Sequence, residues 1–295
     1  MRLAIISDIH GNIHALEAVL RDIETLHVDQ IIVNGDMVNR APNNVTVLDR
    51  LMGRGYIITL GNHEDLMRKW IERDSSLPAD WFDDPFWKGT AWSVQQLLES
   101  GWIDRLRNLP ITYRVEEPGA PTLLISHGSP RHYREGYGHF LSDEKFSEIA
   151  QLYPADILIG SHTHRPFEHQ SGKHLFLNTG AVGAPFNQDA RAQYLLMTWR
   201  NREWQREFRA VPYDRDAALA AYEETGYVPD GELSAFIFRE ELRHSVPIYA
   251  PFWFWTQKNQ KVKGWAAWHQ FWEIYQRFLL NQSVSFKAWI TEIDG

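Results

Sequence analysis

Residues that commonly bind metal ions follow short apolar runs at five places in the chain. A polar group buried without a partner costs free energy, so their repeated position after apolar segments calls for a shared partner. Any one of these patterns occurs by chance, but together they place five of the 13 histidines beside aspartate and asparagine. The combination indicates a metal centre built from Asp8-Ile9-His10, Gly35-Asp36, Gly61-Asn62-His63, His127-Gly128 and His162-Thr163-His164.

Two divalent cations would account for these residue types. Cations about 3.5–4 Å apart need an anionic bridge that offsets their mutual repulsion, and Asp36 follows a central apolar run. Alternate side chains of an extended segment point the same way, so Asp8 and His10 can reach one ion together, and His162 and His164 can both face the site. The chain has no cysteine, which excludes disulfides and thiolate ligands and favours harder cations than structural zinc.

Short runs rich in Ile, Val and Leu are the elements that must position these residues. Runs of this length indicate buried strands, and a helical stripe through Ile13, Leu16 and Val19 lies between the first two. Repetition of strand, helix and strand predicts an α/β sheet with right-handed crossovers, in which ligands collect beyond the carboxyl ends of the strands. Strands are expected at residues 3–7, 30–34, 56–60, 122–126, 156–160 and 174–178, with a closing hairpin in 187–213.

The order of the motifs resembles that of the calcineurin-like metallophosphoesterase superfamily. The chain carries SDIHGN, NGDMVNR, GNHE, SHGSP and GSHTHRPF followed by NTGAVG, all in the family's order, from residue 3 to about residue 184. SDIHGN and NTGAVG look more like the small bacterial phosphodiesterase branch than like the protein phosphatases. The resemblance implies an α/β fold of four layers, in which two mixed β-sheets are flanked by helices.

The same resemblance implies roles for the residues after the strands. His63 matches the family's catalytic histidine, which is not a metal ligand and would stabilise the phosphoryl oxygens and protonate the leaving alkoxide. The implied cofactors are two divalent ions, Mn²⁺ first, with Fe, Zn, Ni or Co as alternatives because such ligands accept several metals. The implied ligands are Asp8, His10 and His164 for the first ion, Asn62, His127 and His162 for the second, and Asp36 as the bridge.

Arg40 lies in GDMVNRAP and matches the arginine of the phosphoprotein-phosphatase pattern G-D-x-V-D-R-G. A guanidinium can bind a phosphate through two hydrogen bonds, so Arg40 is a candidate for substrate binding; a solvated loop arginine is the alternative. Asn39 and Ala41 replace the Asp and Gly of that pattern. These replacements weaken the case for a protein substrate.

The expected activity is hydrolysis of a phosphodiester or phosphomonoester, a nucleotide being one candidate substrate. The resemblance implies in-line attack on phosphorus by a metal-bridging hydroxide. A serine/threonine-type protein phosphatase or a dinucleoside-polyphosphate hydrolase is the second hypothesis, and a catalytically silent scaffold of the same fold is the third. The net charge of −8 argues against binding of a nucleic-acid polymer, so a small phosphoester is the expected partner.

The chain divides by composition into a metallophosphoesterase domain at residues 1–213 and a helical extension at 214–295. The extension has an aromatic stripe, including Trp265 and Trp272, that would pack on the core or on a second copy of the chain. Within the domain, a helical Trp-rich excursion at 66–110 either lines the substrate pocket or packs on the core. The first apolar run is too short for a signal peptide or a membrane span, so a cytoplasmic protein without a membrane partner is expected.

Overall fold

The computed structural model describes residues 1–280. The chain forms two compact units, Met1–Val246 and Pro247–Gly295. Residues 281–295 of the expected extension lie outside the described residues. Across residues 1–280, no helix combines the length and the apolar character needed to cross a membrane.

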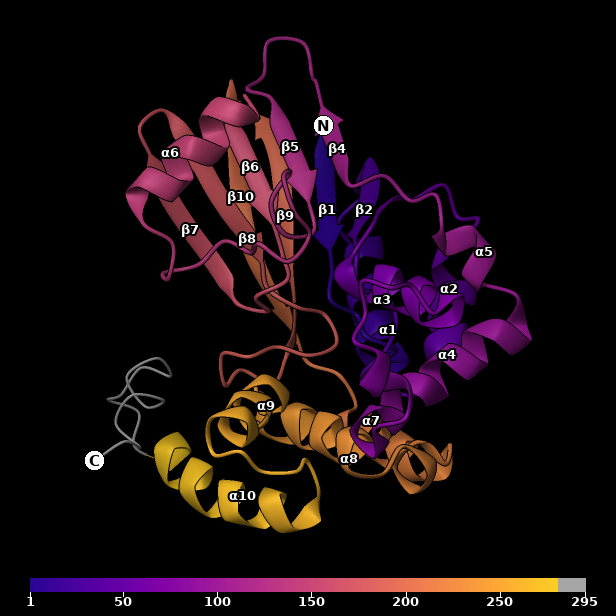
Figure 1. Ribbon diagram of the computed structural model, residues 1–295. Coiled ribbons are helices and arrows are strands. Elements are labelled where there is room, and N and C mark those ends of the chain that lie inside the picture. Colours follow the sequence, from indigo (N-terminus) through magenta and orange to yellow (C-terminus); the bar gives the residue numbers. More distant parts are fainter. Residues whose placement is uncertain (281–295) are drawn as a thin grey trace. The chain divides into compact units, whose positions relative to one another are not determined.

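Two five-stranded mixed β-sheets form the centre of the first unit (Figure 1). One sheet has the order β10-β9-β1-β2-β3 and the other has the order β4-β5-β6-β8-β7. The expected fold, two mixed sheets flanked by helices, is confirmed. The strands are β1 (Arg2–Ile6), β2 (Gln30–Asn34), β3 (Ile57–Thr59), β4 (Thr112–Val115), β5 (Leu123–Ser126), β6 (Ile157–Gly160), β7 (Pro166–Ser171), β8 (His174–Thr179), β9 (Ala192–Arg200) and β10 (Glu203–Val211).

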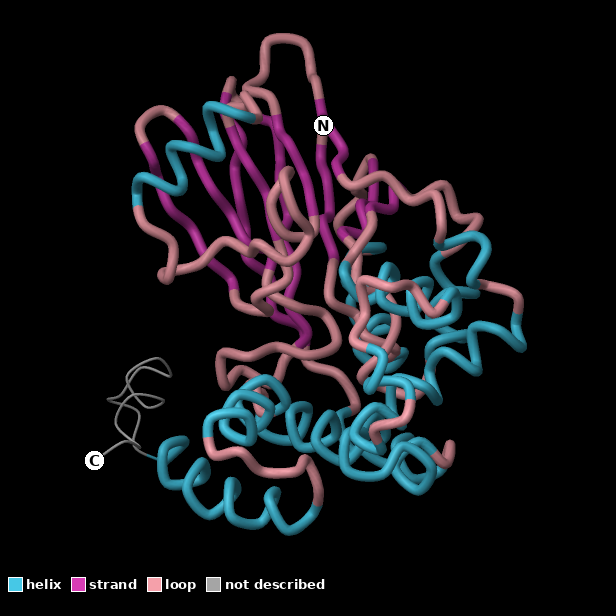
Figure 2. Tube along the Cα trace, viewed as in Figure 1, coloured by secondary structure: helices cyan, strands magenta, loops and turns pink. Residues whose placement is uncertain are grey.

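Parallel pairing directs the carboxyl ends of the predicted strands to one end of the sheets. Strands β1, β2 and β3 pair in parallel, with Ile5 opposite Ile32, and β5, β6 and β8 also pair in parallel. The loops that follow these strands lie at the end of the sheets opposite the N-terminus (Figure 2). Strands β9 and β10 form the predicted hairpin. The antiparallel strands β4 and β7 were not predicted, because both are short and interrupted by polar residues.

Apolar side chains of the two sheets form a shared core. Leu3 and Ile5 of β1 pack in one cluster with Leu123 and Ile125 of β5, and each is at most 2% exposed. Helix α6 lies along the outer face of the second sheet (Figure 1), where Phe146 packs with aromatic and aliphatic residues of that sheet. This packing fixes the strands, and hence the loops that follow them.

Helices and short 3₁₀ turns complete the first unit, most of them on the side of the first sheet (Figure 1). Burial of one apolar face stabilises such helices. In α1, for example, Leu16, Val19 and Ile23 are buried. The 3₁₀ turns are Ala79–Phe82 and Pro85–Trp87. The helices are α1 (Ile13–Glu24), α2 (Asn44–Leu51), α3 (Asn62–Glu72), α4 (Lys88–Ser100), α5 (Ile103–Leu106), α6 (Asp143–Leu152), α7 (Arg215–Glu224) and α8 (Tyr227–His244).

Helices α7 and α8 belong to the first unit, which extends to Val246. Helix α8 packs closely on α4. The approach is so close that a Cβ atom added to Gly231 would lie 3.0 Å from the Cα of Gly89. The sequence places the boundary after residue 213, where strands give way to helices. That change in composition does not reveal which of the later helices pack on the core.

Tryptophans of the excursion pack among themselves and against α8. The ring of Trp87 lies 3.9 Å from that of Trp81 and 5.6 Å from that of Trp70, measured between centroids. Trp87 is 6% exposed, and the Trp92 ring lies 4.7 Å from the Tyr227 ring of α8. These contacts favour a packing role for the excursion over a surface that stacks a substrate base.

The described part of the second unit contains α9 (Tyr249–Lys258) and α10 (Trp265–Leu280). The ring of Phe271 on α10 packs on Phe252 and Trp255 of α9, at centroid distances of 5.3 and 5.8 Å. Trp268 is buried, but Trp265 is 44% exposed. The buried face is therefore centred on Phe271 rather than on the full tryptophan stripe.

Candidate metal centre

The loops at the carboxyl ends of both sheets bring the expected ligands into one cluster. Asp36, which follows β2, belongs to two groups of potential ligand atoms, and the atoms of each group lie within 4.8 Å of one another. A shared carboxylate between adjacent groups is the arrangement required for two cations. One group contains Asp8, His10, Asp36 and His164, and the other contains Asp36, His127 and His162.

The backbone of these loops is in an uncommon conformation. The φ angles of Asp8, His10 and Asp36 are 51°, 50° and 53°, in the left-handed region that residues other than glycine rarely adopt. His162 and His164 share this feature, with φ angles of 67° and 58°. Such conformations cost free energy and cluster at functional sites. Here they turn the ligand side chains inward immediately after each strand.

Each buried aspartate has one oxygen held by the protein and one without a partner. The Ser7 hydroxyl donates to Asp8 Oδ2 at 2.8 Å, and the His63 backbone N–H donates to Asp36 Oδ1 at 2.8 Å. Asp8 Oδ1 and Asp36 Oδ2 have no hydrogen-bond partner although they are buried. Buried oxygens of carboxylates require compensation. A cation bound between the two groups would provide it.

The imidazoles of the first group are oriented by backbone carbonyls. His10 Nδ1 lies 3.2 Å from the Val38 carbonyl, and His164 Nδ1 lies 2.6 Å from the Ala184 carbonyl. A carbonyl can only accept, so both Nδ1 atoms carry the proton and both Nε2 atoms present lone pairs. These two Nε2 atoms are 3.2 Å apart. Two lone pairs at this distance repel each other unless a cation lies between them, as in metal sites whose histidines donate their other N–H to carbonyls.

The second group has the same construction. His127 Nδ1 lies 2.9 Å from the Asn34 carbonyl, which leaves Nε2 facing Asn62 Oδ1 at 3.1 Å and Asp36 Oδ2 at 3.2 Å. Burial lowers the pKa of His127, but the Asp36 and Asp8 carboxylates outweigh burial and raise it to about 10. Burial likewise raises the pKa of Asp36, yet the neighbouring histidines hold it well below its usual range. The buried carboxylates therefore favour positive charge in the cluster, and bound divalent ions would supply it.

His63 lies beside this cluster rather than within either ligand group. Its ring centroid is 4.7 Å from that of His10, and its Nε2 is 3.9 Å from Asp36 Oδ2. Burial lowers the pKa of His63 to about 3, and the positive charges of Arg40 and Arg134 add to this effect against the attraction of Asp36. The position suits a group that contacts a substrate bound at the cluster.

Arg40 is largely buried and contacts α8 and Phe186. Its side chain is 16% exposed and donates through Nη1 to Glu241 Oε2 on α8. The guanidinium carbon also lies 5.1 Å from the centre of the Phe238 ring and 5.6 Å from that of Phe186. The alternative of a solvated loop arginine does not hold, whereas binding of a phosphate by Arg40 stays a prediction.

The loop after β5 contains an exposed arginine that the sequence did not single out. Arg131 of this loop pairs with Glu135 and Glu148. Tyr133 donates its hydroxyl to Asp65, near the start of α3, and Gly136 lies against His162 and Thr163. Arg134 lies between these two anchors. The charge of Arg134 lowers the pKa of His63, and no sequence motif marks this arginine.

Glu64 holds the loop of the bridging aspartate in place. Its carboxylate is fully buried and accepts the backbone N–H groups of Asp36, Met37, Val38 and Gly61 at 2.7–3.3 Å. Burial and the charge of Asp36 raise the pKa of Glu64 to about 7, although the N–H groups of Asp36 and Met37 lower it. Four N–H donors converge on this carboxylate, so Glu64 joins the loop after β2 to the start of α3.

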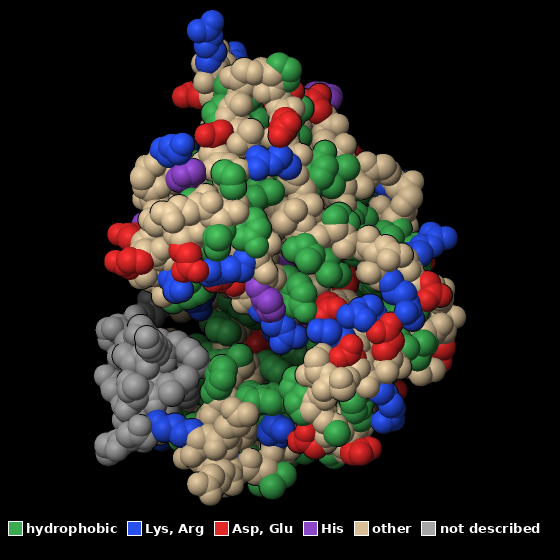
Figure 3. Space-filling model, turned by 45° about the horizontal axis from the view of Figure 1, so that its top comes forward, with side chains coloured by type: hydrophobic (Ala, Val, Ile, Leu, Met, Phe, Trp, Pro, Cys, Tyr) green, Lys and Arg blue, Asp and Glu red, His purple; other side chains and the backbone are tan. Residues whose placement is uncertain are grey.

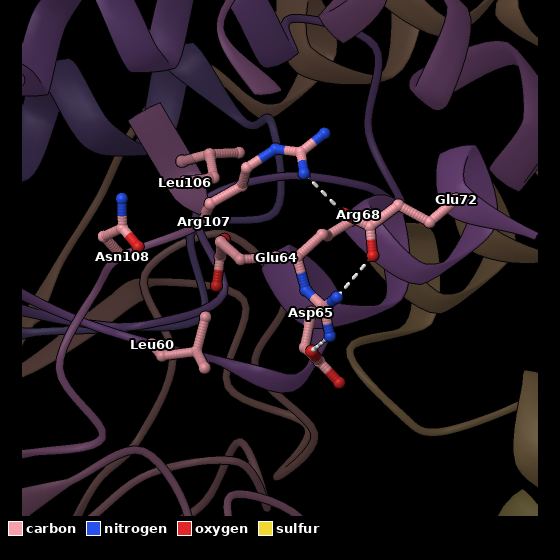
Figure 4. Close-up of a pocket in the computed structure, with 8 residues that line it drawn as sticks. All are labelled: Leu60, Glu64, Asp65, Arg68, Glu72, Leu106, Arg107 and Asn108. Carbon is pink, nitrogen blue, oxygen red and sulfur yellow. Dashed lines mark hydrogen bonds and ion pairs between the residues drawn. The ribbon is translucent and has the colours of Figure 1, made fainter. Parts of the chain in front are cut away.

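On another side, Glu64 lines a cavity of about 400 Å³ (Figure 4). Figure 4 shows it beside the ion-paired Arg68, Glu72 and Arg107. The expected metal ligands do not line this cavity. The residues around it are Leu60, Glu64, Asp65, Arg68, Glu72, Leu106, Arg107 and Asn108.

We expect Glu64→Gln to lower the free energy of unfolding of the metal-free protein by about 1–3 kcal/mol. An amide oxygen can accept only part of the hydrogen bonds, and the amide N–H₂ would oppose backbone donors. Urea unfolding followed by circular dichroism measures the change. Glu72→Gln, at the rim of the same cavity, is the matched control and should cost at most about 1 kcal/mol because its ion pairs are partly exposed. Equal losses in the two variants would contradict the role given to Glu64.

Comparison with known proteins agrees with this fold and cluster. A model of the calcineurin-like phosphoesterase family matches residues 1–166, which is more than half of the chain. The protein therefore belongs to the calcineurin-like phosphoesterase family, and the resemblance noted in its motifs is confirmed. Metal-binding phosphoesterases are the class that this family and the Asp/His cluster define.

Individual relatives extend the similarity of the fold beyond the matched segment. A metallophosphoesterase from Sphaerobacter thermophilus is 23% identical with a TM-score of 0.63, over 83% of this chain and 100% of that chain. The hypothetical protein PH1004 from Pyrococcus horikoshii OT3 is 18% identical with a TM-score of 0.63, over 80% of this chain and 97% of that chain. The uncharacterized protein MJ0912 from Methanocaldococcus jannaschii is 24% identical over 227 residues, 72% of this chain and 88% of that protein.

Proposed function

We propose that this protein is a dinuclear-metal-dependent phosphoesterase that hydrolyses a phosphodiester or phosphomonoester, a nucleotide being one candidate. The observation that carries the proposal is the pair of buried oxygens without a hydrogen bond, Asp8 Oδ1 and Asp36 Oδ2, which face histidine Nε2 atoms at 3.2 Å within two ligand groups that share Asp36. Membership of the family supports the reaction class. Acidic and basic side chains are interspersed on the face shown in Figure 3, which favours a small substrate over a polyanion.

The ligand residues fit the cofactors that the family implies. Bound divalent ions would supply a water-derived nucleophile at neutral pH and positive charge for the phosphoryl oxygens. Mn²⁺ is the first choice, with Fe, Zn, Ni and Co as alternatives, because oxygen and nitrogen ligands accept all of them. Asp8, His10 and His164 would hold one ion, Asn62, His127 and His162 the other, and Asp36 would lie between them.

The remaining groups would bind and orient the substrate. His63 lies next to the shared carboxylate, so its ring can contact a phosphoryl or leaving-group oxygen. Arg40 keeps its contact with Glu241 and supplies positive charge beside His63 rather than a free guanidinium. Arg134 is exposed, and its charge reaches His63, so it is available to the distal part of an anionic substrate.

Metal-dependent turnover tests the proposal. Protein stripped with a chelator and reloaded with Mn²⁺ should hydrolyse an aryl phosphodiester or an aryl phosphomonoester, and a panel of natural phosphoesters should then identify the preferred substrate. The stripped protein should be inactive, because the proposed nucleophile is a water molecule that the metal ions activate. Absence of turnover with manganese, iron, cobalt, nickel and zinc alike would instead favour the scaffold hypothesis.

A further inference from the structure

Asn39 contacts His63 in an orientation that its own hydrogen bonds determine. It is 1% exposed and lies in the loop after β2 with a φ angle of 70°, which asparagine tolerates better than most residues. Its backbone N–H donates to Asn44 Oδ1 at 2.6 Å. Its side-chain Oδ1 accepts the Arg40 backbone N–H at 2.9 Å. The amide oxygen is therefore engaged, and the amide nitrogen points away from Arg40.

That amide nitrogen meets the His63 ring. Asn39 Nδ2 is 2.9 Å from His63 Nδ1, and a carboxamide nitrogen can only donate. His63 Nδ1 must then accept, so the ring proton lies on Nε2. This Nε2 faces the cluster of candidate ligands, 3.9 Å from Asp36 Oδ2. The hydrogen-bond pattern fixes both the rotation of the ring and the position of its proton.

We propose that Asn39 is a positioning residue that holds His63 as the neutral Nε2–H tautomer, so that His63 donates a hydrogen bond to the substrate and keeps its proton. This inference rests on the proposed phosphoesterase function. It changes the expectation that His63 protonates the leaving alkoxide. A neutral imidazole whose Nδ1 already accepts from an amide would have to become an anion to release the Nε2 proton.

The reaction balances without a proton from His63. Water forms the new P–O bond through its oxygen and loses a proton to solvent. The bond from phosphorus to the leaving oxygen breaks, and the leaving oxygen keeps the electron pair and takes a proton from solvent. His63 stabilises charge on the oxygen that it contacts, as donors of an oxyanion hole do. Esters with acidic leaving groups, such as aryl esters, are the substrate class that this arrangement favours.

The ring of His63 gives a direct readout that does not depend on activity. In full-length protein labelled with ¹⁵N-histidine, with zinc as a diamagnetic metal, the His63 resonances are assigned by their loss in His63→Gln. We expect Nε2 to be protonated and Nδ1 to be bare. In Asn39→Asp, a carboxylate of the same shape would accept from Nδ1, so Nδ1 should become protonated. A protonated Nδ1 in the unaltered protein would overturn the proposal.

Steady-state kinetics provide a second test of the role of Asn39. Asn39→Ala should lower kcat by about 10- to 100-fold through misplacement of His63. Asn39→Asp should lower kcat to a similar extent because protonation of Nδ1 leaves Nε2 without the proton that it donates, and KM should change little in both variants. Asn43→Asp introduces the same change in charge in the same loop and should leave kcat unaltered. Equal kcat in Asn39→Ala and the unaltered protein would also overturn the inference. Absence of turnover with every metal would refute the proposed function, whereas the ¹⁵N spectra would still decide the tautomer.

Discussion

His63→Ala should lower kcat/KM for an aryl phosphoester by about 10²- to 10³-fold, the cost of removing one donor to a charged transition state. Bound metal should stay unchanged, because His63 lies outside both ligand groups. Its ring contacts Asn39 and His10, and the backbone N–H that holds Asp36 Oδ1 survives the substitution. Steady-state kinetics and elemental analysis of the same preparation measure the two quantities.

His139→Ala is the matched control for this variant. His139 is exposed in the loop after β5, and its ring makes a T-shaped contact with Phe167. Its loss should leave turnover and metal content unaltered. A His63→Ala protein that loses metal in proportion to its activity would show that His63 is a ligand or a structural support, and would contradict its assignment as a substrate contact.

Asp36→Asn should reduce metal binding more than any substitution of a single histidine. The amide oxygen introduced by the substitution can still accept the His63 backbone N–H. The substitution removes the negative charge that the two ligand groups share. Outer-shell changes alone weaken metal sites by about 10- to 100-fold, so loss of the bridge should exceed about 100-fold. Titration calorimetry with Mn²⁺ measures affinity and stoichiometry, and turnover should be lost with the metal.

Thermal unfolding of Asp36→Asn separates metal loss from misfolding. Metal at 100 times its Kd stabilises the native state by about 2.7 kcal/mol, so the Tm of the unaltered protein should rise on loading. The Tm of Asp36→Asn should respond little to metal, while its metal-free Tm should lie below that of the parent because the attraction between the Asp36 carboxylate and His127 is lost. Asp143→Asn, with a side chain 80% exposed, should respond to metal as the parent does. A full metal response in Asp36→Asn would refute the bridging role.

Much of the fold was predictable because hydrophobic periodicity and strand-end chemistry are local signals. Runs such as residues 30–34 needed only their own composition to be identified as buried strands, and the structure has β2 there. The edge strands β4 and β7 lacked such a signal. The placement of α7 and α8 on the first unit depends on contacts with α1 and α4, which sequence spacing does not encode.

In the site, too, local motifs were predictable from the sequence, whereas contacts between residues far apart in the chain were not. The motifs predicted which residues gather, and the cluster brings them within ligand distance. They did not predict that Glu241, about two hundred residues further along the chain, pairs with Arg40. Nor did they reveal the amide orientation of Asn39, which follows from hydrogen bonds to Arg40 and His63. Contacts of this kind join residues that are far apart in the sequence, so sequence motifs do not predict them.

Anomalous diffraction from crystals loaded with Mn²⁺ would locate the metal ions directly. We expect two peaks about 3.5–4 Å apart, with Asp36 between them. Asp8, His10 and His164 should surround one peak, and Asn62, His127 and His162 the other. A single peak, or peaks away from Asp36, would contradict the dinuclear centre on which the proposed function depends.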